Sequence, residues 1–237
     1  MQVHNVTADA ETFTCNAYLA VGDRTVLVDA GNMSGVVDEI TEHVAALDAV
    51  ALTHQHGDHV AELDAVLDAF DVRESNDSRA RRSQSDSDGV DLLCYDDHPR
   101  RTRKLDDGDA LQIGDEKFEA VYSPGHADDH LAFVSDSTIF SGDVVVYNDG
   151  AFDDGSFGRT DMTGQSRERE IESIREILDR MPEGVESMYS GHGDEFHGNG
   201  REPSDSRSRQ TASDGVREVV ERALERAERR EPKYPGE

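Results

Sequence analysis

The sequence predicts one α+β domain built from short apolar strands and amphipathic helices. Three observations lead to this fold class. The chain has 237 residues, of which 35% are apolar, and this suits one domain better than two independent ones. Several short apolar runs end in glycine or another turn residue, as buried strands do. Other stretches carry apolar residues at helical spacing, as amphipathic helices do.

The first elements along the chain are a hairpin and a helix. Residues 13–21 and 25–29 have the composition of strands, and a Gly-Asp pair between them provides the turn. Residues 34–47 carry apolar side chains on one helical face, with Ser34 as the candidate N-cap. The chain should therefore begin with two paired strands followed by a helix.

Residues 53–59 are the most informative segment. They read Thr-His-Gln-His-Gly-Asp-His, so three histidines and one aspartate lie within six positions. A short, mostly apolar run over 49–53 predicts a strand that leads into this cluster, and helical spacing over 60–70 predicts a helix after it, so the cluster lies in a loop. A lone histidine is more often a surface or core residue, but a solvated loop has no reason to repeat imidazoles two positions apart. Because imidazole and carboxylate groups bind zinc, the cluster predicts a catalytic metal site.

Three later apolar runs end in the same way, with a glycine beside a potential ligand. They end at His126 after Ser-Pro-Gly, at Asp143 after Ser-Gly, and at His192 between two glycines. Each alone is a weak signal because Gly-Asp is an ordinary turn pair, although glycine does let the backbone turn sharply. Together with the first cluster they give seven candidate ligands: His54, His56, Asp58, His59, His126, Asp143 and His192.

The second half of the chain should contain a hairpin and two helices. Residues 111–118 read as two short strands around a turn, and residues 163–180 carry an apolar helical stripe. A final helix is predicted over 214–230. Its apolar stripe can pack on the domain or on a second subunit. Packing within the chain is favoured, and an oligomer formed through this helix stays an alternative.

The domain organisation follows from where apolar residues are missing. Residues 1–200 should form the main domain, and residues 74–90 within it have almost no apolar content, which indicates a polar surface insertion. A polar linker over 201–213 then leads to the last helix.

These ligand motifs resemble those of the metallo-β-lactamase superfamily and, within it, of the glyoxalase II-like hydrolases. The resemblance extends from about residue 12 to about residue 198, and the Phe-Gly-Arg-Thr-Asp stretch at 157–161 supports it. It implies an αββα four-layer sandwich with two metal ions at one edge of the two sheets. Carried over residue by residue, it implies that the first metal is bound by His54, His56 and His126, and the second by Asp58, His59 and His192, with Asp143 bridging.

The resemblance also implies a reaction. Two zinc ions would generate a hydroxide nucleophile that attacks a thioester or a similar small ester. A thioester suits this chemistry because its thiolate leaves without a strong general acid. Asp58 is the candidate catalytic residue, since it can accept a proton besides holding metal. Tyr147 and Arg159 are candidate substrate contacts, although Tyr147 could equally pack in the core and Arg159 could equally bind Asp161.

The main rival function is that of a persulfide dioxygenase-like oxidoreductase with one iron. There His54, His126 and Asp143 would form a triad of two histidines and one carboxylate. The sequence retains all the ligands expected for the second metal, and this favours the hydrolase. For the hydrolase itself, iron or a mixed iron–zinc pair is the alternative to two zinc ions. Lactonase and nuclease activities also occur in the superfamily. A non-catalytic metal module is a more distant alternative, because seven ligands exceed what a structural zinc needs.

The charge of the chain is its second informative feature. It has 52 acidic and 24 basic residues, for a net charge of −28. Such a chain repels itself in dilute salt, and molar salt shortens the Debye length to about 3 Å. We therefore expect a halophilic protein adapted to concentrated intracellular salt. The same charge disfavours nucleic acid as a partner, since phosphate binding needs a positive surface.

The sequence has no long apolar run and no recognisable signal peptide. We therefore expect a cytoplasmic protein that does not enter a membrane.

The cysteines and two further histidines are expected to lie outside the ligand set. Cys15 and Cys94 are expected to be small buried apolar groups. His130 lies four residues after His126, and we expect it to support the ligands or to have a structural role, and not to bind metal. His98 has no assigned role.

Overall fold

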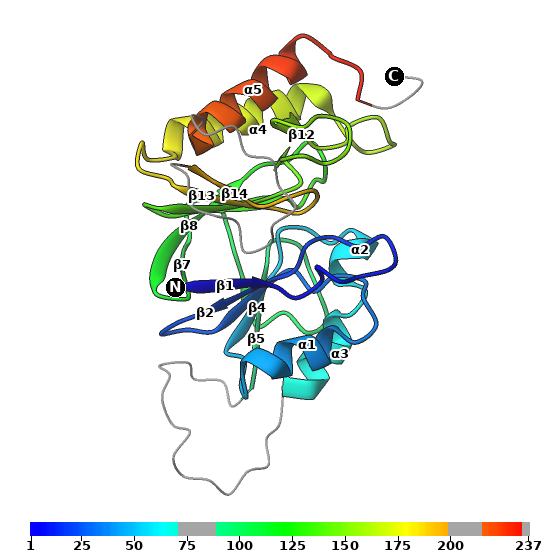
Figure 1. Ribbon diagram of the computed structural model, residues 1–237, viewed down its shortest axis with the longest axis vertical. Helices are drawn as coiled ribbons and strands as arrows, with labels where there is room; N and C mark the ends of the chain where they lie inside the picture. The colour runs from blue at the N-terminus through cyan, green and yellow to red at the C-terminus, as the bar shows by residue number, and fades with distance from the viewer. Residues whose placement is uncertain (71–88, 199–214, 234–237) are drawn as a thin grey trace, which may run out of the picture. The chain divides into compact units, whose positions relative to one another are not determined.

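The computed structural model describes residues 1–70, 89–198 and 215–233 (Figure 1). The chain forms two compact units, each with its own sheet and its own apolar core. The first unit comprises Met1–Leu52, His56–Lys104 and Gln112–Glu116, and the second comprises Thr53–Gln55, Leu105–Leu111 and Lys117–Glu237. The linker predicted over 201–213 and nearly all of the insertion predicted over 74–90 lie outside the described residues, while Val90 is buried in the core of the first unit.

The first unit contains a mixed six-stranded sheet in the order β1-β2-β3-β4-β5-β6. Its first three strands pair antiparallel, and the pairs from β3 to β6 are parallel. The strands are β1 (Gln2–Asn5), β2 (Tyr18–Val21), β3 (Val26–Val28), β4 (Ala49–Ala51), β5 (Asp91–Cys94) and β6 (Arg103–Lys104). The predicted opening hairpin is confirmed in β2 and β3. Residues 13–17 are not in a strand, and β1 was missed because this edge strand has mostly polar, part-exposed residues.

The helices of the first unit are α1 (Val36–His43), α2 (Gly57–Val60) and α3 (Leu63–Phe70). Apolar side chains of α1 and α3 pack on the sheet, among them Ile40 and Val66. The prediction of Ser34 as a helix cap is wrong: the N-cap is Gly35, in the left-handed region at φ 101°, and no side chain caps this helix. The helix predicted over 60–70 is interrupted, because the amide of Glu62 donates to Gly31 O and not to the preceding helical turn.

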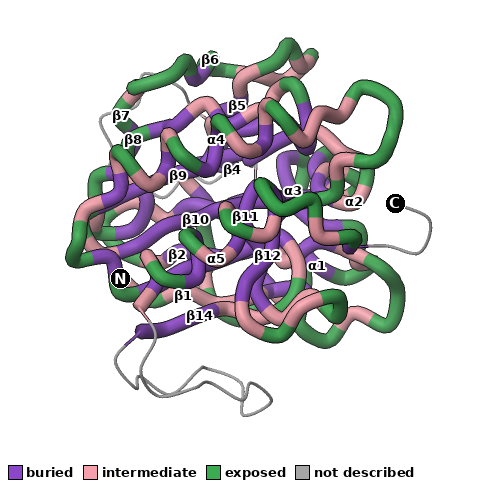
Figure 2. Tube along the Cα trace, turned by 90° about the horizontal axis from the view of Figure 1, so that it is seen from above, coloured by how far each residue is buried: buried purple, intermediate pink, exposed green. Residues whose placement is uncertain are grey.

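The second unit contains a six-stranded sheet in the order β14-β13-β10-β9-β8-β7. The strands are β7 (Ala110–Ile113), β8 (Glu116–Tyr122), β9 (Leu131–Val134), β10 (Thr138–Gly142), β13 (Ser187–Ser190) and β14 (Phe196–His197). The hairpin predicted over 111–118 is confirmed by the adjacent strands β7 and β8. Strand β10 is buried along its length (Figure 2). Two short strands, β11 (Val145–Val146) and β12 (Ser156–Phe157), pair antiparallel beside it.

Helices α4 (Arg167–Arg180) and α5 (Val216–Glu228) cover this second sheet and pack against each other. Helix α4 begins later than predicted, at the N-cap Ser166, whose hydroxyl accepts the amide of Arg169. The apolar stripe of α5, which includes Val219 and Ala223, is buried in the core of the same unit. Cys15 and Cys94 are buried thiols, as predicted. Among the described helices, none has the length and apolar content needed to cross a bilayer.

A half-exposed ion pair in the second unit gives a first prediction. The Asp107 carboxylate accepts hydrogen bonds from Arg180 Nη1 and Nη2 (3.0 and 2.8 Å) and from the Tyr122 amide (2.9 Å). Partial burial acts to raise the pKa of Asp107, but these hydrogen bonds outweigh it and hold the pKa below the usual value. We expect Asp107→Asn to lower the free energy of unfolding by only about 0.5–1 kcal/mol at neutral pH, because water screens the pair.

The pH dependence of that loss follows from the lowered pKa. The folded state holds the proton of Asp107 less tightly than the unfolded chain, so the stabilisation is complete above the unfolded pKa of about 3.9. It disappears as the pH falls through the lower folded pKa. Urea unfolding of both proteins at about pH 7 and about pH 2 measures this difference. If the difference in unfolding free energy between the wild type and Asp107→Asn were the same at both pH values, the role given to the Asp107 carboxylate would be wrong.

Candidate metal centre

Three candidate ligands of the second unit lie at one edge of its sheet. His126 follows β8, Asp143 follows β10 and His192 follows β13. Strands β8 and β10 are both antiparallel to β9, and β10 is parallel to β13, so all three strands run in one direction. Their carboxyl ends therefore meet at the same edge of the sheet. Topology explains how three residues far apart in the sequence reach one place.

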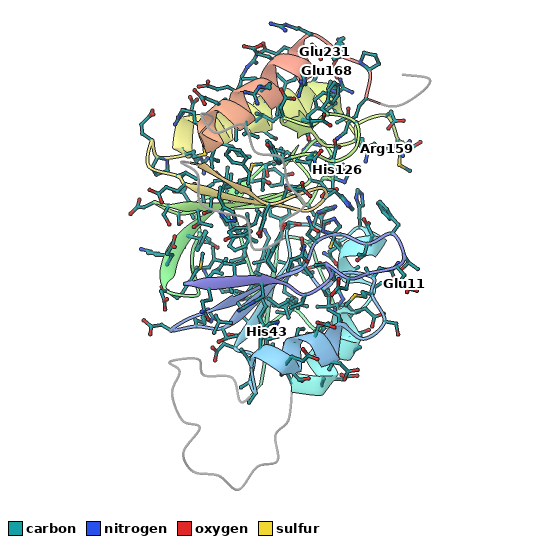
Figure 3. The ribbon with its side chains drawn as sticks, viewed as in Figure 1. Glu11, His43, His126, Arg159, Glu168 and Glu231 are labelled. Carbon is teal, nitrogen blue, oxygen red and sulfur yellow. The ribbon has the colours of Figure 1, made fainter. Side chains whose placement is uncertain are left out.

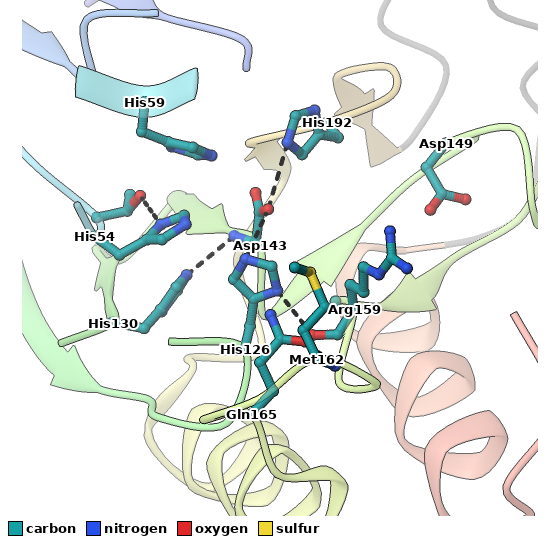
Figure 4. Close-up of polar contacts among 12 residues, drawn as sticks. His54, His59, His126, His130, Asp143, Asp149, Arg159, Met162, Gln165 and His192 are labelled. Carbon is teal, nitrogen blue, oxygen red and sulfur yellow. Dashed lines mark hydrogen bonds and ion pairs between the residues drawn. The ribbon is translucent and has the colours of Figure 1, made fainter. Parts of the chain in front are cut away.

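The carboxylate of Asp143 lies between the two imidazoles (Figure 4). Its Oδ2 is 3.3 Å from His126 Nε2 and 3.4 Å from His192 Nε2. Two ligand atoms that each bind a tetrahedral zinc at about 2.0–2.1 Å are about 3.3 Å apart. The spacing therefore fits a carboxylate oxygen that shares a metal with each histidine, and the donor set of imidazole and carboxylate suits zinc or iron.

Hydrogen bonds fix which nitrogen of His126 can bind a metal. His126 Nδ1 is 2.9 Å from the Arg159 carbonyl oxygen, which can only accept, so Nδ1 carries the proton and Nε2 carries the lone pair (Figure 4). Figure 3 labels both residues on the whole chain. The ring of His54 lies edge-on to that of His126, with 5.0 Å between centroids, and its Nδ1 is 3.1 Å from Thr53 Oγ1. The Leu131 amide donates to Thr53 O and so fixes this segment beside β9.

His130 supports Asp143, as the sequence led us to expect. The Asp143 amide donates to His130 Nε2 at 3.0 Å, so His130 is a neutral imidazole whose Nδ1–H faces Ser123 Oγ at 2.8 Å. The ring is fully buried. Gly142, at φ 51°, makes room for it, since a Cβ there would lie 2.5 Å from His130 Nε2. His130 therefore positions the backbone of the candidate bridging ligand.

A glycine also shapes the loop that carries His192. Gly193 has φ 78°, and a Cβ on it would lie 2.0 Å from the carbonyl oxygen of Tyr147. That carbonyl also accepts the amide of Asp194 at 2.8 Å. The loop after Asp143 and the loop after β13 therefore approach each other backbone to backbone, and this requires glycine at position 193.

The other three candidate ligands, His56, Asp58 and His59, belong to the first unit, on or next to α2. His59 is fully buried, and its Nδ1 donates to Asp29 Oδ2 at 2.9 Å, which leaves the lone pair on Nε2. The carbonyl of His59 accepts the amides of Ala30 and Gly31 at 2.8 and 3.1 Å. Asp29 itself adopts the left-handed region at φ 59°.

Asp29 was not singled out from the sequence. It follows an apolar strand and precedes Ala-Gly, which is the same form as the other ligand segments, so a signal was present. The potential ligand atoms of Cys15, Asp29 and His59 all lie within 4.8 Å of one another. The contact with His59 makes Asp29 a residue that orients a candidate ligand.

The Asp29–His59 pair predicts a loss of metal affinity on substitution. Asp29→Gly removes the acceptor of the His59 proton yet tolerates the left-handed backbone, and we expect metal affinity at that position to fall by about 10- to 100-fold. Asp29→Asn keeps an acceptor oxygen and should lose less. Competition with a chromophoric chelator measures both. Unchanged affinity in Asp29→Gly would show that this pair does not orient a ligand.

Glu170 in α4 was also missed. It is fully buried and accepts the amides of His126 (2.8 Å) and Gly158 (3.1 Å). Burial raises the pKa of Glu170 well above its usual value, and the two amide hydrogen bonds only partly oppose this. It lies within an Arg-Glu-rich stretch that reads as a solvated helix face, so sequence pattern gave no reason to select it.

The two candidate substrate contacts, Tyr147 and Arg159, and the unassigned His98 all have partners within their own units. The Tyr147 side chain is in the core, with its ring centroid 4.8 Å from that of Phe196, which favours the packing alternative. The Arg159 guanidinium binds Asp161, with Nε 2.5 Å from Oδ1. This is the alternative to substrate binding that the sequence offered for Arg159. His98 Nδ1 accepts the Arg100 amide within a turn of the first unit.

The family of this chain is established by comparison with known proteins. The model of the metallo-β-lactamase superfamily matches residues 10–192, and the chain belongs to that superfamily. The probable metallo-hydrolase YqgX of Bacillus subtilis is 30% identical over 186 residues, which cover 76% of this chain and 85% of that protein. A hydroxyacylglutathione hydrolase of Aliivibrio fischeri is 30% identical over 122 residues, or 51% of this chain. The chain spans only 42% of that relative's length.

Solved structures confirm the predicted fold class. The BLEG-1 B3 metallo-β-lactamase superposes with a TM-score of 0.61 at 22% identity, covering 83% of this chain and 94% of that one. The ETHE1 structure from Myxococcus xanthus superposes with a TM-score of 0.60 at 19% identity, covering 94% and 88% of the two chains. At these identities the likeness concerns the fold. The protein has the α+β metallo-β-lactamase fold.

Proposed function

We propose that this protein is a dinuclear metallohydrolase that cleaves a thioester or a similar small ester. The observation that carries the proposal is the position of Asp143 Oδ2, at 3.3 Å from His126 Nε2 and 3.4 Å from His192 Nε2. The proposed ligands are His54, His126, Asp143 and His192, which belong to the second unit, and His56, Asp58 and His59, which belong to the first. Membership of the superfamily supports this set.

The chain's residues have distinct roles in this reaction. Two bound cations supply a water of lowered pKa and a Lewis acid for the substrate carbonyl. Asp143 would help to hold the metal ions, and its negative charge lies between His126 and His192. Buried hydrogen bonds orient the ligands, through Arg159 O for His126 and Asp29 for His59. Asp58 serves as a ligand and accepts a proton during the cycle. A thiolate leaves without a general acid, so no further titratable group is needed.

The substrate class that we propose is a small thioester. A hydroxyacylglutathione hydrolase is among the relatives, which supports a thioester. The chain spans 42% of that relative's length, so the proposal concerns thioesters as a class and not that relative's own substrate. Lactones and phosphodiesters are the further substrates to assay.

A single-iron oxidoreductase acting on persulfides is the second candidate. One observation favours it: His54, His126 and Asp143, a complete triad of two histidines and one carboxylate, all belong to the second unit. The oxidoreductase does not need Asp58, His59 or His192 as ligands. Retention of these three supports the hydrolase over the oxidoreductase.

Three measurements on one preparation decide between the candidates. Protein purified in high salt is tested for metal content, for turnover of a lactoyl thioester and for persulfide-dependent oxygen uptake. The hydrolase is supported if each chain contains two metal ions and cleaves the thioester. The two ions can be zinc, iron or one of each. One iron per chain with oxygen uptake and no thioester cleavage would overturn it.

We also propose that the protein works in a cytoplasm of high salt. The charge of −28 and the presence of only three lysines, Lys104, Lys117 and Lys233, support this. Self-repulsion is screened as the Debye length falls, so the unfolding midpoint should rise steeply between about 0.1 and 1 M potassium chloride. Thermal unfolding followed by circular dichroism measures this rise. A midpoint that is flat or falls over that range contradicts the proposal.

A further inference from the structure

One buried carboxylate connects the backbone on both sides of the His126 ring. Glu170 Oε2 accepts the His126 amide at 2.8 Å, and Oε1 accepts the Gly158 amide at 3.1 Å. Arg159, the residue after Gly158, accepts the proton of His126 Nδ1 at its carbonyl oxygen. These contacts form a closed ring of interactions. Hydrogen bonds link Glu170 to the His126 backbone, the His126 side chain to Arg159, and Gly158 to Glu170, while the chain itself links Gly158 to Arg159. The distance between the His126 backbone and the acceptor of its ring proton is thereby fixed.

The backbone is shaped to admit this carboxylate. Gly125 has φ 148°, and a Cβ there would lie 2.5 Å from both the amide nitrogen and Oε2 of Glu170. A Cβ on Gly158 would lie 2.0 Å from the carbonyl oxygen of Asp143 and 2.9 Å from Glu170 Oε1. Only glycine allows such close approach at either position. The two segments that Glu170 joins are therefore built around it.

The same face of α4 holds the turn over 124–126 by two further bonds. The Ser166 amide donates to Gly125 O at 2.9 Å, and Ser173 Oγ donates to Pro124 O at 2.6 Å. Ser166, Glu170 and Ser173 are spaced four and three residues apart, which places them on one helical face. Of these three, only Glu170 reaches both the turn and the segment that holds the His126 ring.

We propose that Glu170 is a positioning residue that sets the orientation and tautomer of His126 for metal binding. The proposal rests on the proposed function, in which His126 is a ligand. Glu170 is not itself a ligand, since each of its oxygens accepts a backbone amide. A buried acid whose two acceptors hold two loops has a role beyond filling space, because an apolar side chain of equal size would leave both amides unsatisfied. A ring held in one orientation binds metal without first being ordered.

The test variant is Glu170→Gln, and the matched control is Glu172→Gln. Glutamine has nearly the same shape as glutamate, but its NH₂ group cannot accept a backbone N–H, so one of the two loops loses its partner. The control makes the same substitution at an exposed position of α4 and leaves the His126 and Gly158 amides bonded to Glu170. Cobalt(II) is the probe, because its visible absorption reports ligand geometry directly.

We expect Glu170→Gln to lower cobalt affinity by about 10- to 100-fold and to change the visible spectrum of the bound cobalt. Glu172→Gln should keep the wild-type affinity and spectrum. Glu170→Asp, whose shorter side chain reaches one amide at most, should lose affinity to a similar extent, and it replaces Glu170→Gln as the test if that variant does not fold. Wild-type affinity and spectrum in the folded variant would overturn the positioning role.

A third variant separates this proposal from the proposed function. If His126→Ala binds cobalt like the wild type, His126 is not a ligand and the proposed function fails. If His126→Ala loses cobalt while Glu170→Gln retains it with an unchanged spectrum, only the positioning role fails. The unfolding free energy of each metal-free variant shows whether a loss of affinity reflects general destabilisation.

Discussion

Replacement of Asp143 by asparagine is expected to reduce hydrolysis by more than about 100-fold and to lower the metal content of the protein. Residues that only orient ligands cost about 10- to 100-fold when removed, and a shared ligand should cost more. Asparagine keeps the shape of the side chain and the backbone hydrogen bond to His130. It removes the negative charge that lies between His126 and His192. The effect should therefore arise at the metal centre and not from the fold.

Metal analysis and steady-state kinetics measure this effect, with unfolding as a check on the fold. His98→Ala is the matched control, because His98 Nδ1 only accepts a turn amide and should not affect the metal content. Asp143→Asn with wild-type metal content and turnover would remove Asp143 from the centre.

The second large effect is expected at Lys233. Its ammonium group is 2.6 Å from Asp149 Oδ2, and the two side chains are only 2% and 6% exposed. It also donates to the carbonyl of Phe157, next to the segment that Glu170 holds. Lys233→Met leaves the Asp149 charge buried without its partner, and breaking such pairs costs about 3–5 kcal/mol. We expect the free energy of unfolding to fall by about that amount.

Denaturant unfolding of Lys233→Met gives this number directly, and Lys117→Met, an exposed lysine, is the control with an expected change within about 0.5 kcal/mol. Adding Asp149→Asn to Lys233→Met should recover part of the loss, because it removes the unpaired charge. A loss below about 1 kcal/mol in the single variant would show that the pair is not buried in solution.

The strand ends could be read from the sequence because each combines an apolar run, a glycine and a ligand. His126, Asp143 and His192 follow that form, and strand direction then brings them to one edge of a sheet. The fold class follows from the same runs. Residues that act through another residue's backbone could not be found in this way. Glu170 accepts main-chain amides, which no side-chain spacing records.

Other differences have similarly local causes. Strand β1 is an edge strand with mostly polar residues, so it lacks the alternation that marks a half-buried strand. The predicted cap Ser34 was displaced by Gly35, whose left-handed backbone starts α1 one residue later. Lys233 lies 84 positions after its partner Asp149, and a pair of such separation leaves no local pattern.

X-ray absorption of the metal-loaded protein is the most direct test of the proposed dinuclear metallohydrolase. We expect about two metal ions per chain, each with histidine nitrogen neighbours, and a metal–metal distance of roughly 3.5–4 Å. His59→Ala should remove about one metal and the metal–metal signal, while leaving histidine neighbours on the other. One metal per chain in the wild type, with no metal neighbour, would contradict the claim.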